Sequence, residues 1–338
     1  MKIGIVGASG YAGGELIRLL AGHPTFTLYY ISAGSNAGEL ITSIHPHLTA
    51  FAGQRFASTS VAEINDCELV FFALPHGESG KLISQIAPHI KVVDLGADYR
   101  LTSESQWKKY YGGEYAGNWK YGLPEITSIQ EISTSDRIAN PGCYATAIAL
   151  SAAPAISAGL IDSTDIVVVA ASGTTGAGRS AKVNLLGSEV MNSLSSYKFG
   201  GVHQHIPEIE QVLSSINGKE TKISFTPILA PMPRGILATT TAKLVKAATL
   251  DQMRTLYTEY FTSPFVHILP EGQMPQTSSV LGTNNVHMQI AIDAHTDRLV
   301  VSTAIDNLGK GAAAQAIQNA NVMAGLDQSE GLTQMGVR

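Results

Sequence analysis

The first half of the chain alternates short apolar stretches with segments of helical spacing. The apolar stretches that predict strands are residues 2–6, 27–32, 69–73 and 91–95, and the predicted helices between them are 10–20 and 79–90. Short apolar strands separated by helices are typical of parallel sheets with crossover helices. This half is therefore predicted to be α/β, with a Rossmann-type doubly wound parallel sheet.

The second half has strand patterns with few helices between them. The predicted strands are 166–171, 222–228, 237–244, 286–293 and 299–305, and the last two are joined by a short polar turn that predicts a hairpin. An Ala- and Gln-rich helix is predicted at 311–324. This pattern indicates a second, α+β domain, whose mostly antiparallel sheet is covered on one face. Pro141 and Gly142 mark the predicted boundary between the domains.

Composition narrows the class of protein. The chain has 338 residues, 44% of them hydrophobic, and is longer than a domain with a single hydrophobic core usually is. Its net charge of −5 argues against a nucleic-acid partner. Only 14% of the residues are charged, which predicts that a second copy covers part of the surface, as a homodimer or homotetramer. The chain opens directly on a strand pattern, and its longest apolar stretch, 145–161, is too short to span a membrane. We expect a cytoplasmic protein without a membrane partner.

A glycine-rich turn follows the first predicted strand. Gly7, Gly10 and Gly13 are spaced as GxxGxxG, a variant of the dinucleotide fingerprint. Gly7 permits the tight turn, the backbone at Ser9 or Gly10 can approach a pyrophosphate, and Gly13 lets the helix pack on the strand. The helix start, with Tyr11 and Ala12, adds unpaired N–H groups and a favourable dipole. An ordinary Gly-rich turn is the alternative.

The end of the second predicted strand favours NADP over NAD as the cofactor. An NAD site usually has an acidic residue there to hold the ribose 2′-hydroxyl. Here Ser32 and Ser35 occupy the region, and no acid appears before Glu39. Hydroxyls and backbone amides suit a 2′-phosphate, although no Arg or Lys stands close in the sequence.

One of the two cysteines has the setting of a nucleophile. An Asn-Pro-Gly turn places Cys143 at the start of a predicted helix, where the dipole and unpaired amides lower a thiol pKa and can stabilise an oxyanion. The alternative is a buried, inert cysteine. Cys67 has no comparable setting, and we interpret it as inert.

A thiolate nucleophile needs a proton shuttle. His203 and His205, two residues apart on what we interpret as extended chain, would share a face, and Glu208 is close enough to orient one of them. We predict His205 as the general acid/base, with His203 second. A zinc site is an alternative, but no third ligand group is apparent, so no metal is expected.

Two further features suit anions. The Gly-rich stretch that begins with Ser172 and Gly173 follows a predicted strand and can line a cofactor with backbone amides. Arg100 lies near the carboxyl end of a strand, and Arg234 lies in a Pro/Gly-rich segment. Each arginine can hold an oxyanion by a bidentate contact, or can equally form a surface ion pair.

Together these stretches resemble the N-acetyl-gamma-glutamyl-phosphate reductase family almost from end to end. The most specific are NPGCYAT at 140–146 and HQHIPEIEQ at 203–211, with GASGYAGGEL at 7–16, DLGADYRL at 94–101, SGTTGAGR at 172–179, PMPRG at 231–235 and DNLGKGAA at 306–313. The resemblance implies a glyceraldehyde-3-phosphate dehydrogenase-like fold. It further implies an NADP-binding domain at 1–142, to which residues 307–338 return, a catalytic and oligomerisation domain at 143–306, and Asn307 near the nicotinamide.

The reaction that the resemblance implies reduces N-acetyl-L-glutamyl 5-phosphate with NADPH, in arginine biosynthesis. Cys143 would form a thioester as phosphate leaves, hydride would reduce that thioester, and His205 would protonate the thiohemiacetal oxygen. Arg100 would hold the leaving phosphate and Arg234 the substrate carboxylate. The alternatives are reduction of another acyl phosphate, as in aspartate-semialdehyde dehydrogenase, a non-redox thiol acyltransferase or hydrolase, and a non-catalytic NADP sensor.

Overall fold

The computed structural model describes residues 1–337, which form two compact units. The N-terminal unit comprises Met1–Pro141 and Ala312–Leu332, and the C-terminal unit comprises Gly142–Gly311 and the residues from Thr333 on. The division falls one residue before the predicted boundary. The returning segment is shorter than the predicted 307–338, because both of its ends belong to the C-terminal unit.

The N-terminal unit contains a seven-stranded sheet in which every pairing is parallel, so the predicted doubly wound sheet is confirmed. The strand order is β3-β2-β1-β4-β5-β7-β6. The strands are β1 (Lys2–Val6), β2 (Thr27–Ala33), β3 (Ala57–Ser58), β4 (Leu69–Phe72), β5 (Lys91–Asp94), β6 (Lys120–Tyr121) and β7 (Arg137–Ala139). The order reverses between β1 and β4, and open α/β sheets bind ligands at the carboxyl ends of the strands at such a point.

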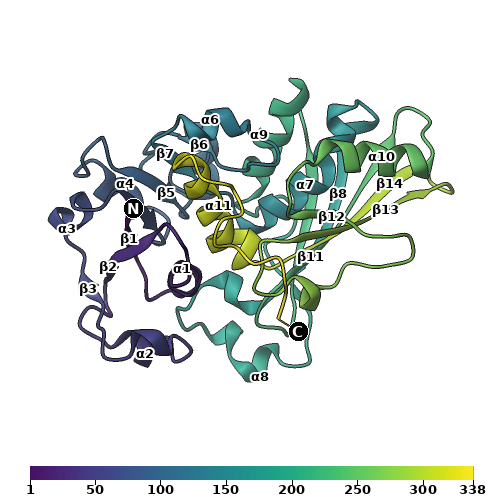
Figure 1. Ribbon diagram of the computed structural model, residues 1–338. Helices are drawn as coiled ribbons and strands as arrows, with labels where there is room; N and C mark the ends of the chain where they lie inside the picture. The colour runs from purple at the N-terminus through teal and green to yellow at the C-terminus, as the bar shows by residue number, and fades with distance from the viewer. Residues whose placement is uncertain (338) are drawn as a thin grey trace. The chain divides into compact units, whose positions relative to one another are not determined.

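Short helices connect these strands. They are α1 (Tyr11–Leu20), α2 (Ile41–Ile44), α3 (Val61–Asn65), α4 (Ser79–Ile83), α5 (Glu104–Tyr110) and α6 (Ile129–Ser133), with α11 (Ala314–Met323) returning near the end of the chain. Helix α11, yellow in Figure 1, packs against α1, α6 and β5. Helical structure was predicted near 79–90. Helix α4 lies there but ends at Ile83, and turns follow it.

The C-terminal unit contains a second seven-stranded sheet, in the order β12-β13-β14-β11-β8-β10-β9. The strands are β8 (Ile161–Ser172), β9 (Ser195–Ser196), β10 (Ile223–Leu229), β11 (Ile236–Leu244), β12 (Val266–Ile268), β13 (Val286–Asp293) and β14 (Arg298–Ile305). Strands β10 and β8 pair in parallel, as do β12 and β13, and the other pairings are antiparallel. The mostly antiparallel sheet and the β13–β14 hairpin are therefore confirmed.

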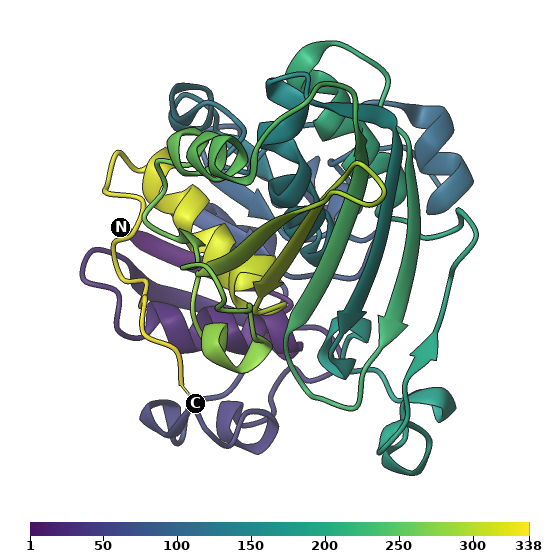
Figure 2. The same cartoon turned by 90° about the vertical axis from the view of Figure 1, so that its right-hand side faces the viewer.

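Helices cover one face of this second sheet. They include α7 (Cys143–Ser157), α9 (Ile206–Asn217) and α10 (Leu250–Tyr260), with the one-turn α8 (Gly187–Val190) in the loop after β8. Helix α7 packs against β8, β11 and β14, and all its residues from Tyr144 to Ile156 are buried. Its many alanines allow this close approach. Figure 2 looks onto the long strands β11, β8 and β10.

The other face of the second sheet is open and partly apolar. In β8, Ile166 and Val168 are buried, whereas Val167 and Val169, between and beside them, are 36% and 43% exposed. This alternation is what a strand covered on one face produces. Among residues 1–337, no helix combines the length and the apolarity that crossing a membrane requires.

Candidate active site

Cys143 is the first residue of helix α7. Gly142 is the N-cap, in an extended conformation, and no side chain caps the N–H groups of the first turn. These N–H groups and the helix dipole favour a thiolate at Cys143, which is partly exposed. Cys67 differs in its exposure, because it is buried, and this burial raises the pKa of its thiol to about 11. The structure thus distinguishes the two cysteines as the sequence predicts.

A buried carboxylate from a second helix holds the start of α7. Glu208, in the first turn of α9, is fully buried, and its Oε1 accepts a hydrogen bond of 2.7 Å from the backbone N–H of Gly142. This bond links the N-termini of α7 and α9. Glu208 therefore positions the backbone on which Cys143 stands, and its predicted role of orienting a histidine stays a prediction.

The two histidines lie at the N-terminus of α9, with their rings in edge-to-face contact 4.9 Å apart. His205 is the N-cap of the helix, so the prediction of extended chain here was wrong. The chain turns because the helix begins at Ile206 and Pro207 occupies its first turn, where proline is favoured. Both rings contact Tyr144, the neighbour of Cys143, with centroid separations of 5.4 Å and 6.1 Å.

The environments of the two histidines differ. His203 is 2% exposed and packs edge-on against Phe225, and its Nδ1 accepts a hydrogen bond of 3.1 Å from the backbone N–H of His205. Burial, followed by the nearby His205, lowers the pKa of His203 to about 2. His203 is therefore neutral with its proton on Nε2, and it cannot supply a proton from an imidazolium at neutral pH.

Two tyrosines complete this cluster. The Tyr197 hydroxyl donates to the Tyr144 hydroxyl at 3.0 Å. Burial raises the pKa of Tyr197 to about 12 and that of Tyr144 further still, and the charge of Cys143 acts in the same direction on both. Both phenols are therefore neutral. We define the aromatic cluster as Tyr144, Tyr197, His203, His205 and Phe225.

Arg234 is held by a buried carboxylate of the same unit. Its Nε and Nη2 donate to the two carboxylate oxygens of Asp306 at 3.1 Å and 2.5 Å. Asp306 is fully buried and also accepts from the backbone N–H groups of Gly282 and Leu308. The bidentate pair sets the direction of the guanidinium, while the Arg234 side chain stays 21% exposed.

The Gly-rich stretch after β8, the PMPRG segment and Asn307 form one bonded assembly. Gly173 N–H donates to Gly235 O at 2.9 Å, Gly235 N–H donates to the Asn307 side-chain oxygen at 2.7 Å, and the Asn307 amide donates to the Thr175 hydroxyl at 3.0 Å. A Cβ at Gly173 would lie 2.7 Å from the backbone of Arg234, so only glycine fits there. Ser172, which precedes this turn, is buried.

A second close approach confines Cys143. A Cβ at Gly311 would lie 2.7 Å from the Cβ of Cys143, so the helical turn that contains Gly311 packs directly on the nucleophile. That turn is a π-helix over Gly309–Ala313, where the sequence predicted the start of an ordinary helix. Turns of this kind occur frequently at functional sites.

In the N-terminal unit, the glycine turn between β1 and α1 has the geometry that an anion requires. Gly7 has φ +86°, and a Cβ there would lie 2.5 Å from Ala73 O, after β4. A Cβ at Gly13 would lie 2.5 Å from the Cα of Ala8, so Gly13 packs against the turn itself, whereas packing on the strand was predicted. Gly10 is the N-cap of α1, no side chain caps the helix, and its first turn contains no acidic residue. The N–H groups at this end of α1 thus fit a pyrophosphate.

The segment after β2 is less simple than predicted. Ser32 is fully buried, its hydroxyl donates to Ile5 O at 3.4 Å, and its carbonyl accepts from the N–H groups of Gly7 and Ala8. Ser32 therefore supports the glycine turn from within the sheet. Ser35 is exposed, so its hydroxyl is the more accessible of the two.

Arg100 joins two strand ends of the first sheet. It is 4% exposed, and its Nε and Nη2 donate to the carbonyls of Asn140 and Leu95, each at 2.8 Å. Leu95 follows β5 and Asn140 follows β7. Two guanidinium nitrogens are thus engaged with backbone carbonyls, and the contact with a leaving phosphate stays a prediction.

Comparison with known proteins identifies the family. Residues 2–134 match the family described as "Semialdehyde dehydrogenase, NAD binding domain", and residues 143–307 match "Semialdehyde dehydrogenase, dimerisation domain". The N-acetyl-gamma-glutamyl-phosphate reductase of Acidothermus cellulolyticus is 53% identical over 99% of this chain and 98% of its own. That of Salinispora tropica is 51% identical over 100% and 99%.

The chain belongs to the N-acetyl-gamma-glutamyl-phosphate reductase family. Its N-terminal unit is accordingly a nicotinamide dinucleotide-binding domain.

Solved structures agree on the fold of the reductase family. Aspartate semialdehyde dehydrogenase II of Vibrio cholerae, complexed with ASA, aligns with a TM-score of 0.72 at 15% identity, covering 96% of this chain and 98% of its own. Aspartate semialdehyde dehydrogenase of Candida albicans, solved with NADP, gives 0.72 at 17% identity with the same coverage. At this identity the likeness establishes the fold.

Sequence reasoning missed three residues of the site. Tyr144 stands beside the predicted nucleophile, and Asp306 opens the DNLGKGAA stretch, so both lay within motifs that were already noted. An Asp directly after a predicted strand was the available signal for Asp306. Tyr197 had none, because it lies in an exposed, irregular segment and reaches the cluster only through tertiary packing.

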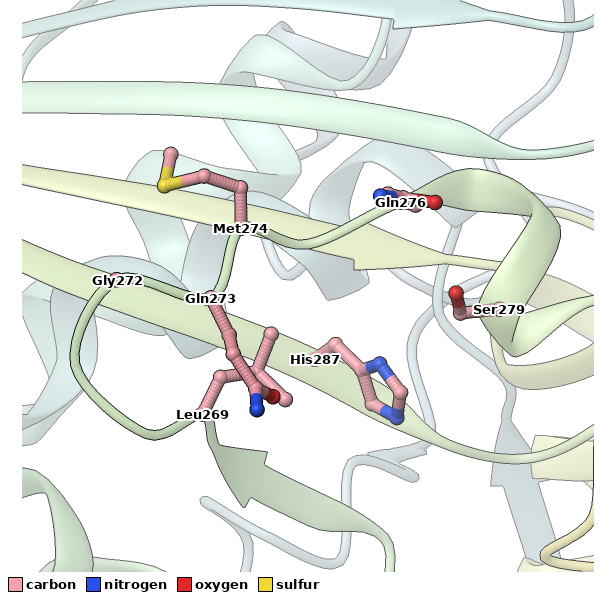
Figure 3. A pocket seen from close by; sticks show the side chains of 7 residues that line it. All are labelled: Leu269, Gly272, Gln273, Met274, Gln276, Ser279 and His287. Atoms are coloured by element: carbon pink, nitrogen blue, oxygen red, sulfur yellow. The ribbon is translucent and has the colours of Figure 1, made fainter.

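The C-terminal unit also contains a cavity of about 560 Å³ that none of the predicted site residues lines. It lies where the loop 269–276 passes His287 on β13 (Figure 3). Gln289 fastens this loop by donating to the carbonyls of Pro270 and Gln273. Its lining includes the Ser279 hydroxyl and the His287 imidazole but no cysteine and no carboxylate.

Proposed function

We propose that this protein reduces N-acetyl-L-glutamyl 5-phosphate to N-acetyl-L-glutamate 5-semialdehyde with NADPH, releasing phosphate through a Cys143 thioester, in arginine biosynthesis. The observation that supports it most is Cys143 at the first position of α7, beside the aromatic cluster with its two histidines. The full-length relatives bear the name of this reaction.

In the first half-reaction, the Cys143 thiolate attacks the acyl carbon of the substrate. The C–S bond forms, the bond from the acyl carbon to the phosphate oxygen breaks, and inorganic phosphate leaves and takes up a proton. The N–H groups of the first turn of α7 face the oxyanion of this step. A thioester is more easily reduced than a carboxylate, which is the gain from covalent catalysis.

In the second half-reaction, the thioester carbon would accept the hydride that NADPH supplies when it is bound. The former carbonyl oxygen then bears negative charge, and His205 donates a proton to it. As the C=O bond reforms, the C–S bond breaks, the proton returns to His205 and the Cys143 thiolate is regenerated. His205 has this role because the lowered pKa of His203 keeps that partner neutral.

The remaining residues position these groups. Glu208 holds Gly142, the N-cap of the nucleophile's helix, and His203 accepts a hydrogen bond from the backbone of His205. We assign the substrate carboxylate to Arg234, aligned by Asp306. Arg100 fastens the ends of β5 and β7, so we assign it a structural role and no phosphate contact.

Each unit, taken by itself, has groups that would suit one part of NADPH. The turn formed by Gly7, Ser9 and Gly10 and the N–H groups of Tyr11, Ala12 and Gly13 suits the pyrophosphate. Ser35 and the absence of an acid between Ser32 and Glu39 suit a 2′-phosphate. The assembly of Ser172, Gly173 and Asn307 suits the nicotinamide end.

The test is an assay in the phosphorolytic direction. We expect NADP⁺ reduction with N-acetyl-glutamate semialdehyde and phosphate, and little with aspartate semialdehyde. The opposite preference would make the protein an aspartate-semialdehyde dehydrogenase. The non-redox alternative would be favoured if neither aldehyde produced NADPH absorbance and the protein instead hydrolysed an added acyl thioester.

Replacement of Cys143 tests the thioester step, and replacement of Cys67 is its matched control. Cys143→Ser should lower turnover at least about a thousandfold, because an alcohol is a far weaker nucleophile than a thiolate. NADPH binding, followed by its fluorescence, should be retained. Cys67→Ser removes the buried thiol and should leave turnover unchanged, and full turnover of Cys143→Ser would exclude the thioester.

A further inference from the structure

We propose that Arg55 binds the 2′-phosphate of the cofactor and is the residue that makes this chain prefer NADPH to NADH. The inference rests on the proposed function, since it names the cation that NADPH use requires. It concerns a residue 20 positions beyond Ser35, where the local sequence offers no basic side chain.

Arg55 is the sole Lys or Arg between Arg18 and Lys81. In the dinucleotide fold, the ribose of the adenosine lies by the end of the second strand, and an Arg close to this position accommodates a 2′-phosphate. The strand in question is β2, which ends at Ala33. The cation must therefore come from a segment that tertiary structure brings to the end of β2.

The excursion between β2 and β3, residues 34–56, does this. It folds back on itself through an antiparallel bridge between Leu40 and Arg55. Gly38 N–H donates to Phe56 O at 2.8 Å, and Phe56 N–H donates to Glu39 O at 3.0 Å. Arg55 Nη1 donates to Gly38 O at 2.7 Å, so the guanidinium stands beside the segment that follows β2.

The same excursion is fixed to the glycine turn. His45 is buried, and its Nε2 lies 3.0 Å from Ala8 O, within the turn between β1 and α1. A Cβ at Gly14 would lie 2.5 Å from the His45 ring, so the excursion packs directly on α1. The excursion that contains Arg55 and the turn that suits the pyrophosphate are thus parts of one packed assembly.

The charge balance at this point suits a phosphate. Arg55 is exposed, and the carbonyl of Gly38 neutralises none of its charge. The nearest acid in sequence, Glu39, is exposed, and its backbone carbonyl accepts the hydrogen bond from Phe56 N–H. A guanidinium forms charge-assisted, often bidentate contacts with phosphate. NADH lacks the phosphate and gains nothing from this contact.

The experiment measures binding without turnover. Dissociation constants of NADPH and NADH, and of adenosine 2′,5′-bisphosphate against adenosine 5′-monophosphate, are compared by calorimetry for wild type and Arg55→Gln. We expect Kd for NADPH and the bisphosphate to rise about ten- to a hundredfold. Kd for NADH and the monophosphate should stay within about twofold, because neither ligand has the 2′-phosphate that Arg55 would contact.

Two further variants make the result specific. Arg55→Lys keeps the charge and should retain part of the preference. Lys108→Gln removes one positive charge from an exposed i,i+4 pair on α5 and should change neither affinity. Equal weakening of both dinucleotides by Arg55→Gln, or an unchanged preference for NADPH, would overturn the inference. A wild type that binds NADH as tightly as NADPH would contradict the proposed cofactor itself.

Discussion

At the scale of single residues, the two histidines differ in their surroundings, although both are buried. They stand two positions apart and contact the same tyrosine, yet His203 is neutral and packed while His205 caps a helix. A general acid/base must exchange a proton during turnover, and a histidine with a pKa near 2 does not do so at neutral pH. The pair can therefore be separated by substitution.

We predict that His205→Asn lowers kcat by about 10²–10⁴-fold, the usual value of an acid/base group. His203→Asn should lower it by less than about tenfold, since asparagine can still accept from the His205 backbone. Steady-state NADPH oxidation measures both. A larger loss with His203→Asn would exchange the roles.

A buried carboxyl in the N-terminal unit predicts a pH effect on stability. Burial raises the pKa of Asp94 to about 7, against about 3.9 when unfolded. Between these values the folded state binds more protons than the unfolded state. The contribution of this group to stability is therefore present below about pH 4 and is lost as the pH rises to about 7.

Asp94→Asn should remove this dependence while keeping an acceptor for the Ser79 hydroxyl. Both tryptophans, Trp107 and Trp119, belong to the N-terminal unit, so their fluorescence reports its unfolding. The urea midpoint should fall from pH 5 to pH 8 less in the variant than in wild type. An equal fall in both proteins would refute the assignment.

At the scale of elements, the site depends on two helix starts that are joined by one bond. The N-termini of α7 and α9 carry Cys143 and His205, for which we propose the roles of nucleophile and acid/base, and Glu208 connects the two helices through Gly142. The Glu208 carboxylate fixes the position of Gly142, but its negative charge lies near Cys143 and disfavours a thiolate there. The bond explains why a fully buried acid is present in this helix.

Glu208→Ala would leave the Gly142 N–H without its acceptor, at a cost of about 1–3 kcal/mol. We expect faster amide exchange over the first turn of α7, by about ten- to a hundredfold, measured by hydrogen exchange and mass spectrometry. Glu208→Gln keeps an acceptor oxygen and should exchange nearly as slowly as wild type. Slow exchange in both variants would show that the bond does not hold the helix.

At the scale of the whole molecule, the open face of the second sheet is the surface that we propose for self-association. Its C-terminal unit matches a dimerisation domain, and the exposed Val167 and Val169 stand on the face away from the helices. In register beside them are Thr239 and Thr241 of β11. We propose that a second copy covers this face in a homodimer, or in a homotetramer built from such dimers.

Val169→Arg should weaken this association by placing a charge in an apolar interface, and light scattering after size exclusion would report a smaller species. The control is Ile129→Arg, at a similarly exposed apolar site on α6, outside the residues that match the dimerisation domain. This variant should leave the mass unchanged. An unchanged mass for both variants would place the interface elsewhere.

The sequence by itself determined the elements and the local chemistry of this protein. The nine longer strands begin and end within about five residues of their predicted bounds, because side-chain alternation and apolar runs are local properties. The strands of two or three residues, β3, β6, β7, β9 and β12, were not predicted, because such short segments have no pattern of their own. The glycine turn at Gly7 and the cysteine at the start of α7 are equally local, since a positive φ and a helix N-terminus are set by neighbouring residues.

Only the tertiary structure decided which of these features act together. Asp306 meets Arg234 across 72 residues, Glu208 meets Gly142 across 66, and Arg55 meets Gly38 across 17. No local pattern encodes such pairs, because strand register and helix packing bring them together. The same packing buried Ser32, Arg100 and His203, and each of them forms a hydrogen bond with a backbone group.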